Sequence, residues 1–306
     1  MAGLNAAPRG PLAGHLAMLG FSFLVAGSFA LGVQAANFIS PSALNAVRFW
    51  IAAGIIGIAA LLSTGLPRGM WVAPWRYVLL AAFLTTYFVL MFEGLKTATA
   101  VSAAAVFTLT PVMAAGAGWV LLRQRLTGRM ALALGIGAIG ALWVIFRADL
   151  SALLALEVGR GEAVYALGCL AHAIYTPLVT RLNRGEAAVQ FSFGTLAAGA
   201  VLLTAWGWGD LRATDWAGLP GIVWVTILYT AVFASAATFV LLQFAALRLP
   251  GAKVMAYTYL VPAWVICWQV ALGGAVPAPL VGVGVVLTAA ALLLLLRDDS
   301  AARPVR

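Results

Sequence analysis

Apolar stretches of about twenty residues recur along the whole chain, separated by short polar segments. As a helix, one such stretch crosses the roughly 30 Å hydrocarbon core of a bilayer. The segments between them, such as those near Lys96 and Pro277, are too short for a soluble domain. The pattern predicts an all-α integral membrane protein with ten transmembrane helices, at about residues 15–34, 44–64, 74–95, 99–121, 129–147, 162–182, 189–208, 220–245, 252–272 and 279–297.

Composition agrees with a protein that acts within the lipid bilayer. Hydrophobic residues make up 64% of the chain, charged residues make up 9%, and the mean hydropathy is +1.03, values that are atypical of soluble domains. Arg9, the first apolar run and the small residues from Val33 to Ala36 imitate a secretory signal. The run is nearer the length of a spanning helix, so we expect it to be retained. Cys169 and Cys267 fall within predicted helices and are expected to pack as apolar residues.

The net charge of +9 follows the loops and forms no single patch, which argues against nucleic-acid binding. One side of the membrane has Lys96, Arg147, Arg160 and Arg212, with Arg48 at the start of the second helix. The other side has Arg9, Arg68, Arg76, Arg123, Arg125, Arg129, Arg181, Arg184, Arg248, Lys253, Arg297, Arg303 and Arg306. Because cytoplasmic loops are enriched in Lys and Arg, we expect both termini in the cytoplasm.

The second half of the chain repeats features of the first. Phe92, Leu95 and Lys96 correspond to Phe244, Leu247 and Arg248, and Pro111 then corresponds to Pro262; the segments 46–49 and 188–191 correspond as well. We therefore predict a segment 1–14, a five-helix repeat 15–147, a linker 148–161, a second repeat 162–297 and a tail 298–306. Because five is odd, the repeats have opposite orientations, which is characteristic of secondary transporters.

Pro111 and Pro262 each fall midway along a predicted helix, the fourth and the ninth. Proline removes a backbone donor and frees a carbonyl, and a membrane helix tolerates this where neighbours or a cavity satisfy that carbonyl. We interpret the pair as hinges of a transport path. A kink that only improves packing is the alternative interpretation.

These features resemble those of a known family. Arg48 and Phe49 at the second helix, the segments 92–96 and 244–248, and the two midspan prolines are similar to the EamA repeat of the drug/metabolite transporter superfamily. Within it, the chain most resembles the YddG-type aromatic amino acid exporters of bacterial inner membranes. Gln124 and Gly274 stand where the family commonly has glutamate. The resemblance implies ten helices in inverted repeats, a path lined by helices one, three, four, six, eight and nine, and location in a bacterial inner membrane.

Aromatic and polar residues far from the ends of those helices are the candidate substrate-binding residues. Tyr257, Trp264 and Trp268 are spaced by seven and four residues, which predicts one helical face. Aromatic rings there could stack on a planar substrate side chain. The remaining candidates are Ser28, Phe83, Tyr87, Phe107, Thr110, His172, Tyr175, Tyr229 and Phe233. Packing or lipid contact is the alternative interpretation for each.

Ionisable residues inside a membrane are costly and are therefore functional candidates. No carboxylate falls at the middle of a predicted helix; Glu93 and Glu162 lie near helix ends, where we expect them at the membrane interface. This absence argues against a pump for lipophilic cations. His172 is the midspan group that titrates near neutrality and is the candidate proton carrier, with uncoupled transport as the alternative.

Other classes of protein lack support in the sequence. The chain has no P-loop and no HExxH, Ser/Lys or paired-Asp site within its helices, so we predict no enzyme activity, no metal and no cofactor. Gly135, Gly137, Gly140, Gly282 and Gly284 are expected to pack helices within a monomer, with a dimer interface as the alternative. We expect an exporter of amino acids, aromatic ones preferred, that works by alternating access. A multidrug or cation exporter is the alternative, and an intramembrane enzyme or sensor is the weaker one.

Overall fold

The computed structural model describes residues 11–123, 127–154, 158–246, 248–249 and 251–297, and its regular elements there are all helices. The predicted tail 298–306, the first ten residues, Gln124 and Leu247 lie outside the described residues. In chain order, the elements are α1 (Pro11–Ala35), α2 (Pro41–Ser63), η1 (Arg68–Val72), α3 (Trp75–Gly94), α4 (Ala100–Phe107), α5 (Thr110–Leu122), α6 (Gly128–Ile145), α7 (Leu150–Leu154), α8 (Arg160–Leu182), α9 (Ala188–Trp206), α10 (Trp208–Ala213), α11 (Gly221–Ala231), η2 (Val232–Ala237), α12 (Thr238–Ala246), α13 (Gly251–Ala256), η3 (Tyr257–Leu260), α14 (Val261–Ala271) and α15 (Val281–Leu296).

Nine helical segments of the described chain are long and apolar enough to cross a membrane. Each lies at a predicted position, and the predicted ends differ from the observed ends by only a few residues. The tenth prediction contains α15, whose 16 residues span about 24 Å. It begins only at Val281, because Pro277 and Pro279 precede it. The prediction of an all-helical membrane protein is confirmed, and the count of ten is supported at nine positions.

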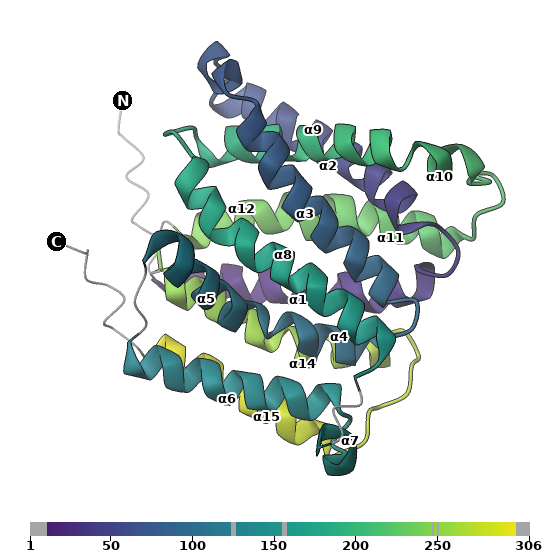
Figure 1. The fold of residues 1–306 in the computed structure, drawn as a ribbon, viewed down its shortest axis with the longest axis vertical. Coiled ribbons are helices and arrows are strands. Elements are labelled where there is room, and N and C mark those ends of the chain that lie inside the picture. Colours follow the sequence, from purple (N-terminus) through teal and green to yellow (C-terminus); the bar gives the residue numbers. More distant parts are fainter. Residues whose placement is uncertain (1–10, 124–126, 155–157, 247, 250, 298–306) are drawn as a thin grey trace, which may run out of the picture.

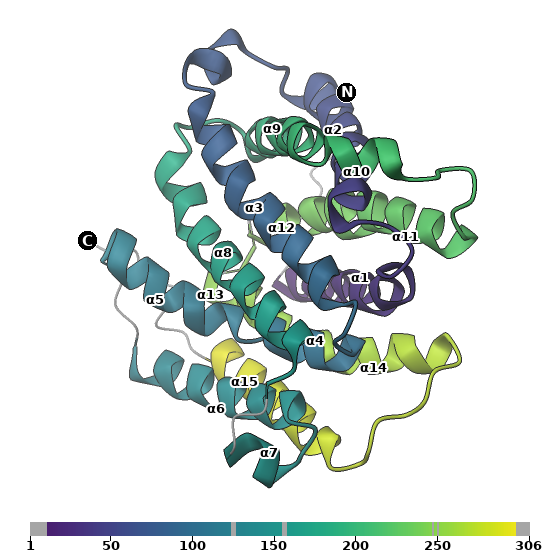
Figure 2. The same cartoon turned by 45° about the vertical axis from the view of Figure 1, so that its right-hand side comes forward.

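Equivalent spans of the two halves pack against each other: α2 against α9, α6 against α15, and α4 of the fourth span against α14 of the ninth. Figures 1 and 2 show the α6 and α15 pair at one edge of the bundle and α2 with α9 at the opposite edge. In addition, α3 packs against α8, while α1 packs against α11 and α12. The third span is equivalent to the eighth and the sixth to the first, so interchanging the halves turns the α3–α8 pairing into the pairing of α11 and α12 with α1. A two-fold relation between the repeats requires this. The predicted two-repeat organisation is confirmed.

Both midspan prolines lie at breaks in their helices. Pro111 is the second residue of α5, which is separated from α4 by Thr108 and Leu109. Pro262 is the second residue of α14, which follows the 3-10 helix η3. Proline is well tolerated in the first turn of a helix, where its missing N–H group has no intrahelical partner anyway. The sequence thus divides the same span of each repeat into two helical pieces.

Glycines bring pairs of helices into close contact. A Cβ atom on Gly140 of α6 would lie 2.7 Å from the carbonyl oxygen of Gly284 on α15, and one on Gly284 would lie 2.6 Å from that of Gly140. The crossing of α3 and α8 is similarly close, because a Cβ atom on Gly94 would lie 2.6 Å from the Gly161 oxygen. Gly140 and Gly284 therefore have the predicted role in packing within the chain.

Replacing Gly140 with alanine is expected to lower the free energy of unfolding by about 1–3 kcal/mol, because the added methyl group meets rigid backbone. Gly135 on the same helix has no atom within 4 Å of a built Cβ position, so Gly135→Ala is the matched control. This second change should be neutral or stabilise the helix by up to about 1 kcal/mol. Thermal unfolding in detergent micelles measures both, and equal melting temperatures would contradict the close crossing.

Candidate substrate site

Four of the predicted site residues form one cluster between the repeats, named here the His172 cluster: Tyr87 on α3, Phe107 on α4, and His172 and Tyr175 on α8. The ring of His172 lies 4.6 Å from that of Tyr87 and 6.2 Å from that of Phe107, centroid to centroid. Tyr175 stacks on His172 at 5.8 Å with 23° between the ring planes. These spacings are typical of favourable aromatic contacts. The cluster therefore offers planar apolar faces contributed by both repeats.

Two polar groups in this region have no hydrogen-bond partner among the described residues. They are the buried Nδ1 atom of His172 and the buried hydroxyl of Thr110, which is three residues beyond Phe107. Leaving a buried polar group unpaired costs about 1–3 kcal/mol. An unpaired group beside an aromatic cluster is available to a ligand, since a ligand can supply the missing partner.

Four more of the predicted aromatic residues form a second cluster, named here the Trp264 cluster: Tyr229, Phe233, Trp264 and Trp268, with Phe23 of α1. Phe23 stacks on Trp268 at 5.1 Å and meets Trp264 edge-on at 5.4 Å. Tyr229 meets Trp268 edge-on at 5.6 Å and lies 5.4 Å from Phe233. This cluster joins α1 to the second repeat.

Hydrogen bonds fix the Trp264 cluster to one turn of α1. Trp264 donates from Nε1 to the Ser22 hydroxyl at 3.0 Å, and Trp268 donates from Nε1 to the Phe23 carbonyl at 3.1 Å. Tyr229 donates from its hydroxyl to the Leu24 carbonyl at 2.9 Å. Buried Trp and Tyr rings usually find such a partner for their polar atom. The polar atoms of this cluster are therefore occupied, unlike the Nδ1 atom of His172.

Two residues that were not predicted, Phe29 of α1 and Tyr165 of α8, extend the His172 cluster towards α1, the helix that carries Phe23 of the Trp264 cluster. Phe29 lies 5.9 Å from Phe107 and 5.9 Å from Tyr165 of α8. Tyr165 also shares a hydrogen bond with Tyr87, with 3.1 Å between their hydroxyl oxygens. Tyr165 precedes His172 by seven residues and so lies on the same face of α8, a spacing that could have identified it. We see no comparable sequence signal for Phe29.

Four predicted residues are members of neither cluster: Thr110, described above, and Tyr257, Phe83 and Ser28. Tyr257 lies apart from Trp264 and Trp268, with its hydroxyl 2.7 Å from Nδ1 of His15. The reason is η3, since a 3-10 helix has three residues per turn and shifts the face that later residues present. Phe83 is partly buried on α3, and Ser28 is buried on α1.

Arg48 occupies a position that the charge pattern did not reveal. The sequence places it at the start of a helix on the outer side, but α2 begins seven residues earlier and Arg48 is 1% exposed. Its Nε and Nη2 atoms donate to the Ser235 hydroxyl on η2, at 3.2 and 3.1 Å. Its guanidinium carbon lies 3.8 Å from the centre of the Phe88 ring. A buried cation thus lies between α2, α3 and η2.

A second buried arginine, Arg76, holds the repeats together at one end of the bundle. Arg76 Nη2 lies 2.6 Å from Glu186 Oε1, and Nη1 donates to the Leu182 carbonyl at 2.7 Å. Glu186 also accepts from the Arg184 backbone N–H at 2.6 Å. Burial alone raises the pKa of Glu186, but the hydrogen bonds from Arg76 and Arg184 outweigh it and lower this pKa to about 2.

This shift predicts a loss of stability in acid. A carboxylate whose folded pKa lies below its unfolded value, about 4.3, stabilises the fold fully above that value and loses the contribution as the pH falls towards 2. We expect the pair to contribute about 3 kcal/mol near neutral pH. Melting temperatures of the protein and of Glu186→Gln in detergent should therefore differ at pH 6 and converge towards pH 2. A difference that stays constant over this range would contradict the assignment.

The other two acidic residues that the sequence places near helix ends, Glu93 and Glu162, differ in exposure. Glu93 lies 2.6 Å from Lys96, and the two form a partly exposed ion pair at the end of α3. Glu162 lies in the first turn of α8, where it is 4% exposed and accepts a hydrogen bond from Ser102 at 2.7 Å. Within the described chain, no group of three or more His, Cys, Asp or Glu residues is placed to hold a metal ion.

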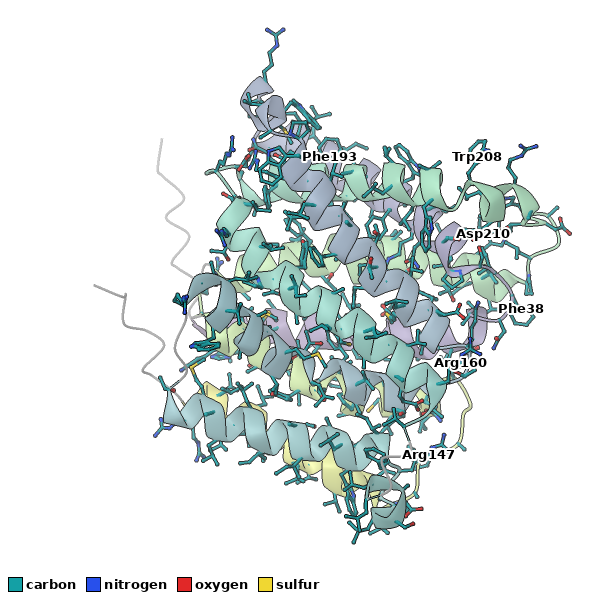
Figure 3. All side chains as sticks on the ribbon, viewed as in Figure 1. Phe38, Arg147, Arg160, Phe193, Trp208 and Asp210 are labelled. Carbon is teal, nitrogen blue, oxygen red and sulfur yellow. The ribbon has the colours of Figure 1, made fainter. Side chains whose placement is uncertain are left out.

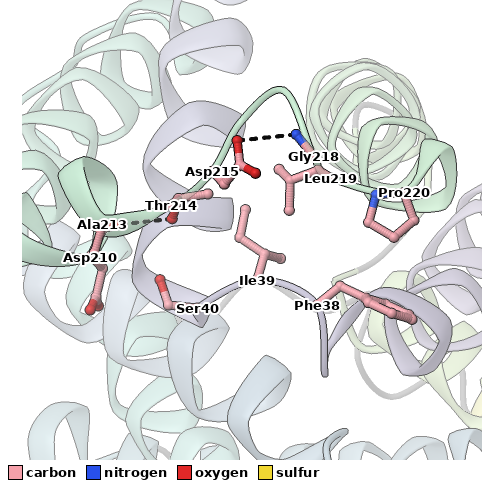
Figure 4. A pocket seen from close by; sticks show the side chains of 10 residues that line it. All are labelled: Phe38, Ile39, Ser40, Asp210, Ala213, Thr214, Asp215, Gly218, Leu219 and Pro220. Carbon is pink, nitrogen blue, oxygen red and sulfur yellow. Dashed lines mark hydrogen bonds between the residues drawn. The ribbon is translucent and has the colours of Figure 1, made fainter.

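A cavity of about 620 Å³ lies at the end of the bundle that carries Asp210, away from both clusters. Its walls are the loop after α1 and the segment from α10 to α11 (Figure 4): Phe38, Ile39, Ser40, Asp210, Ala213, Thr214, Asp215, Gly218, Leu219 and Pro220. Figure 3 places Phe38, Trp208 and Asp210 at this end and Phe193 at the other. Ser42 of α2 donates to Asp210, so hydrogen bonds join the two repeats here as well as at Glu186.

A helical bundle of two repeats, with aromatic clusters between them and exposed apolar side chains such as Leu132, Ile139 and Leu293 around it, defines a multi-pass membrane transporter. The model of the EamA-like transporter family matches residues 12–146 and 159–297, so the chain belongs to this family. The predicted family is confirmed, and the two matches coincide with the two predicted repeats.

Two individual proteins add to this comparison. A Bacillus subtilis (strain 168) protein named uncharacterized transporter YyaM is 24% identical over 223 residues, which are 72% of this chain and 73% of the relative. A solved crystal structure of a protein matches with a TM-score of 0.65 at 19% identity, covering 92% of this chain and 94% of that chain. The first similarity supports the transporter class, and the second supports the fold.

Proposed function

We propose that the protein exports amino acids, with a preference for aromatic ones, by alternating access through the interface between its repeats. The observation that carries this proposal is the His172 cluster, in which stacked rings from both repeats surround an imidazole whose Nδ1 atom has no partner among the described residues. Aromatic faces suit a planar side chain, and the free nitrogen suits a polar group of the same substrate.

In this proposal, the substrate enters from the cytoplasm and stacks between the two aromatic clusters. The breaks before Pro111 and Pro262 divide the fourth and ninth spans, so one half of each can tilt relative to the other. Tilting would alternately open the end near Glu186 and the end near Asp210, where hydrogen bonds now join the repeats. The positive charge of the loops supports an inner-membrane orientation with the Glu186 end in the cytoplasm.

Export by living cells tests the proposal. Bacteria that produce the protein should survive a toxic aromatic analogue, p-fluorophenylalanine, better than cells with an empty vector, and should retain less labelled phenylalanine. Cells that produce the protein with Trp264 and His172 both replaced by alanine serve as the control. Unchanged survival with p-fluorophenylalanine, together with new resistance to methyl viologen, would contradict the amino acid proposal and favour a cation exporter.

A further inference from the structure

Arg48 carries a buried positive charge without an anion beside it. Its three hydrogen bonds go to neutral oxygens: two to the Ser235 hydroxyl and a longer one, 3.5 Å from Nη1, to Asn45 Oδ1. A guanidinium has five N–H donors, so two of them remain. The ion pairs of the described chain are Arg76 with Glu186 and Lys96 with Glu93. No described carboxylate therefore neutralises Arg48.

Arg76 provides the internal comparison. It is equally buried, at 1% exposed, but it has a carboxylate at 2.6 Å and two carbonyl oxygens as further acceptors. Where this fold uses a buried arginine to hold helices together, it supplies the counter-ion. The position equivalent to Arg48 in the second repeat is Gln190, which is neutral. The second repeat therefore folds without a charge at this position.

The contacts of Arg48 have the geometry of a carboxylate receptor. Its Nε and Nη2 atoms form the edge of a guanidinium that binds both oxygens of a carboxylate through parallel hydrogen bonds. Here one oxygen, the Ser235 hydroxyl, accepts from both atoms. Arg48 belongs to the first repeat and Ser235 to the second, so this edge lies at the interface between them. Ser235 lies on the π-helix η2, and π-helical turns are frequent at functional sites.

Phe88 connects this receptor to the aromatic site. Its ring lies below the Arg48 guanidinium at 3.8 Å and is 4.7 Å from the ring of Tyr87, a member of the His172 cluster. A molecule with its carboxylate at Arg48 would thus have its aromatic part beside that cluster. Only the Phe88 ring separates the Arg48 guanidinium from the Tyr87 ring, and this short separation suits a small amino acid.

We propose that Arg48 binds the carboxylate of the transported substrate through its Nε and Nη2 atoms, in exchange for the Ser235 hydroxyl. The inference rests on the proposed function for the identity of the aromatic part, and it restricts the substrates to carboxylates. Amides and amines of the same shape would bind poorly, because they cannot accept both hydrogen bonds from Nε and Nη2. Lipophilic cations would be repelled by the positive charge of Arg48.

Counterflow of labelled phenylalanine in proteoliposomes tests this restriction with two competitors. The first, 3-phenylpropanoate, has the carboxylate without the amine, and phenylalaninamide has the amine without the carboxylate. For the unchanged protein, we expect the carboxylate to inhibit at a concentration about tenfold lower than the amide does. Arg48→Met and Arg48→Lys should raise the KM for phenylalanine about tenfold or more and bring the two inhibition constants together.

Lys96→Gln is the matched control, since it removes a cation that is 31% exposed and lies outside both clusters. It should keep the values of the unchanged protein. Size-exclusion chromatography shows which variants fold. If Arg48→Met does not fold, Arg48→Lys alone decides the result. A folded Arg48 variant with the original ratio of inhibition constants would overturn the inference.

A binding measurement separates this inference from the proposed function. If the unchanged protein shows no phenylalanine counterflow, the proposed function fails, but its melting temperature in detergent should still rise with 3-phenylpropanoate and not with phenylalaninamide. That rise should disappear in Arg48→Lys. Failure of the carboxylate to raise the melting temperature, or an equal rise in the variant, would overturn the role of Arg48.

Discussion

Replacing Glu186 with alanine is expected to lower the free energy of unfolding by about 3–5 kcal/mol, because the change leaves a buried charge without its partner. The side chains of Arg76 and Glu186 are 1% and 8% exposed, and their closest atoms are 2.6 Å apart. Arg76 lies in α3 and Glu186 in the loop between α8 and α9, so the pair joins the two repeats. Unfolding by heat or denaturant in detergent micelles measures the effect.

The chain provides a matched control in its other described ion pair. Glu93 and Lys96 are 39% and 31% exposed, and Glu93→Ala should cost no more than about 1 kcal/mol. Replacing both Arg76 and Glu186 with leucine should recover most of the stability, since removing both charges removes the unpaired one. Equal effects of Glu186→Ala and Glu93→Ala would show that the Arg76 pair does not stabilise the fold.

Replacing His172 with phenylalanine is expected to reduce phenylalanine transport about tenfold or more without destabilising the protein. Phenylalanine keeps a planar ring against Tyr87 and Tyr175 but removes the Nδ1 atom that has no described partner. Removing an unpaired buried polar atom should leave the free energy of unfolding unchanged or raise it by about 1–3 kcal/mol. Transport in proteoliposomes and unfolding in micelles measure the two effects separately.

His15 is the matched control, because its Nδ1 atom has a hydrogen-bond partner and that of His172 has none among the described residues. His15 Nδ1 lies 2.7 Å from the Tyr257 hydroxyl, so His15→Phe breaks a hydrogen bond and should lower the free energy of unfolding by about 0.5–1.5 kcal/mol. His15→Phe should thus lower the free energy of unfolding, whereas His172→Phe should leave it unchanged or raise it. A folded His172→Phe protein with unchanged transport would show that the imidazole has no part in substrate binding.

The helical segments, the repeats and the breaks at Pro111 and Pro262 could be predicted from the sequence, because membrane thickness and proline chemistry act locally. The grouping of aromatic residues could be predicted only in part. The face shared by Trp264 and Trp268 follows from a spacing of four, but Tyr257 leaves that face because η3 is a 3-10 helix. Propensities did not distinguish such a turn from an α-helix of the same composition.

The burial of Arg48 could not be predicted from the sequence either. A basic residue near the start of an apolar segment is usually interfacial, and the segment extends further only because Ser40 caps α2 and Pro41 begins it. Its partner Ser235 is 187 residues away on a π-helix that no proline marks. The pairing of Arg76 with Glu186 across 110 residues is equally non-local. Contacts of this kind depend on how the two repeats pack, which hydrophobic patterns do not specify.

The measurement that tests the account most directly is counterflow by the purified protein in liposomes loaded with phenylalanine. Labelled phenylalanine outside should accumulate transiently, and unlabelled phenylalanine or threonine added outside should suppress this accumulation, while methyl viologen should not. No accumulation of phenylalanine or threonine, together with uptake of methyl viologen, would contradict an amino acid transporter built around the His172 cluster.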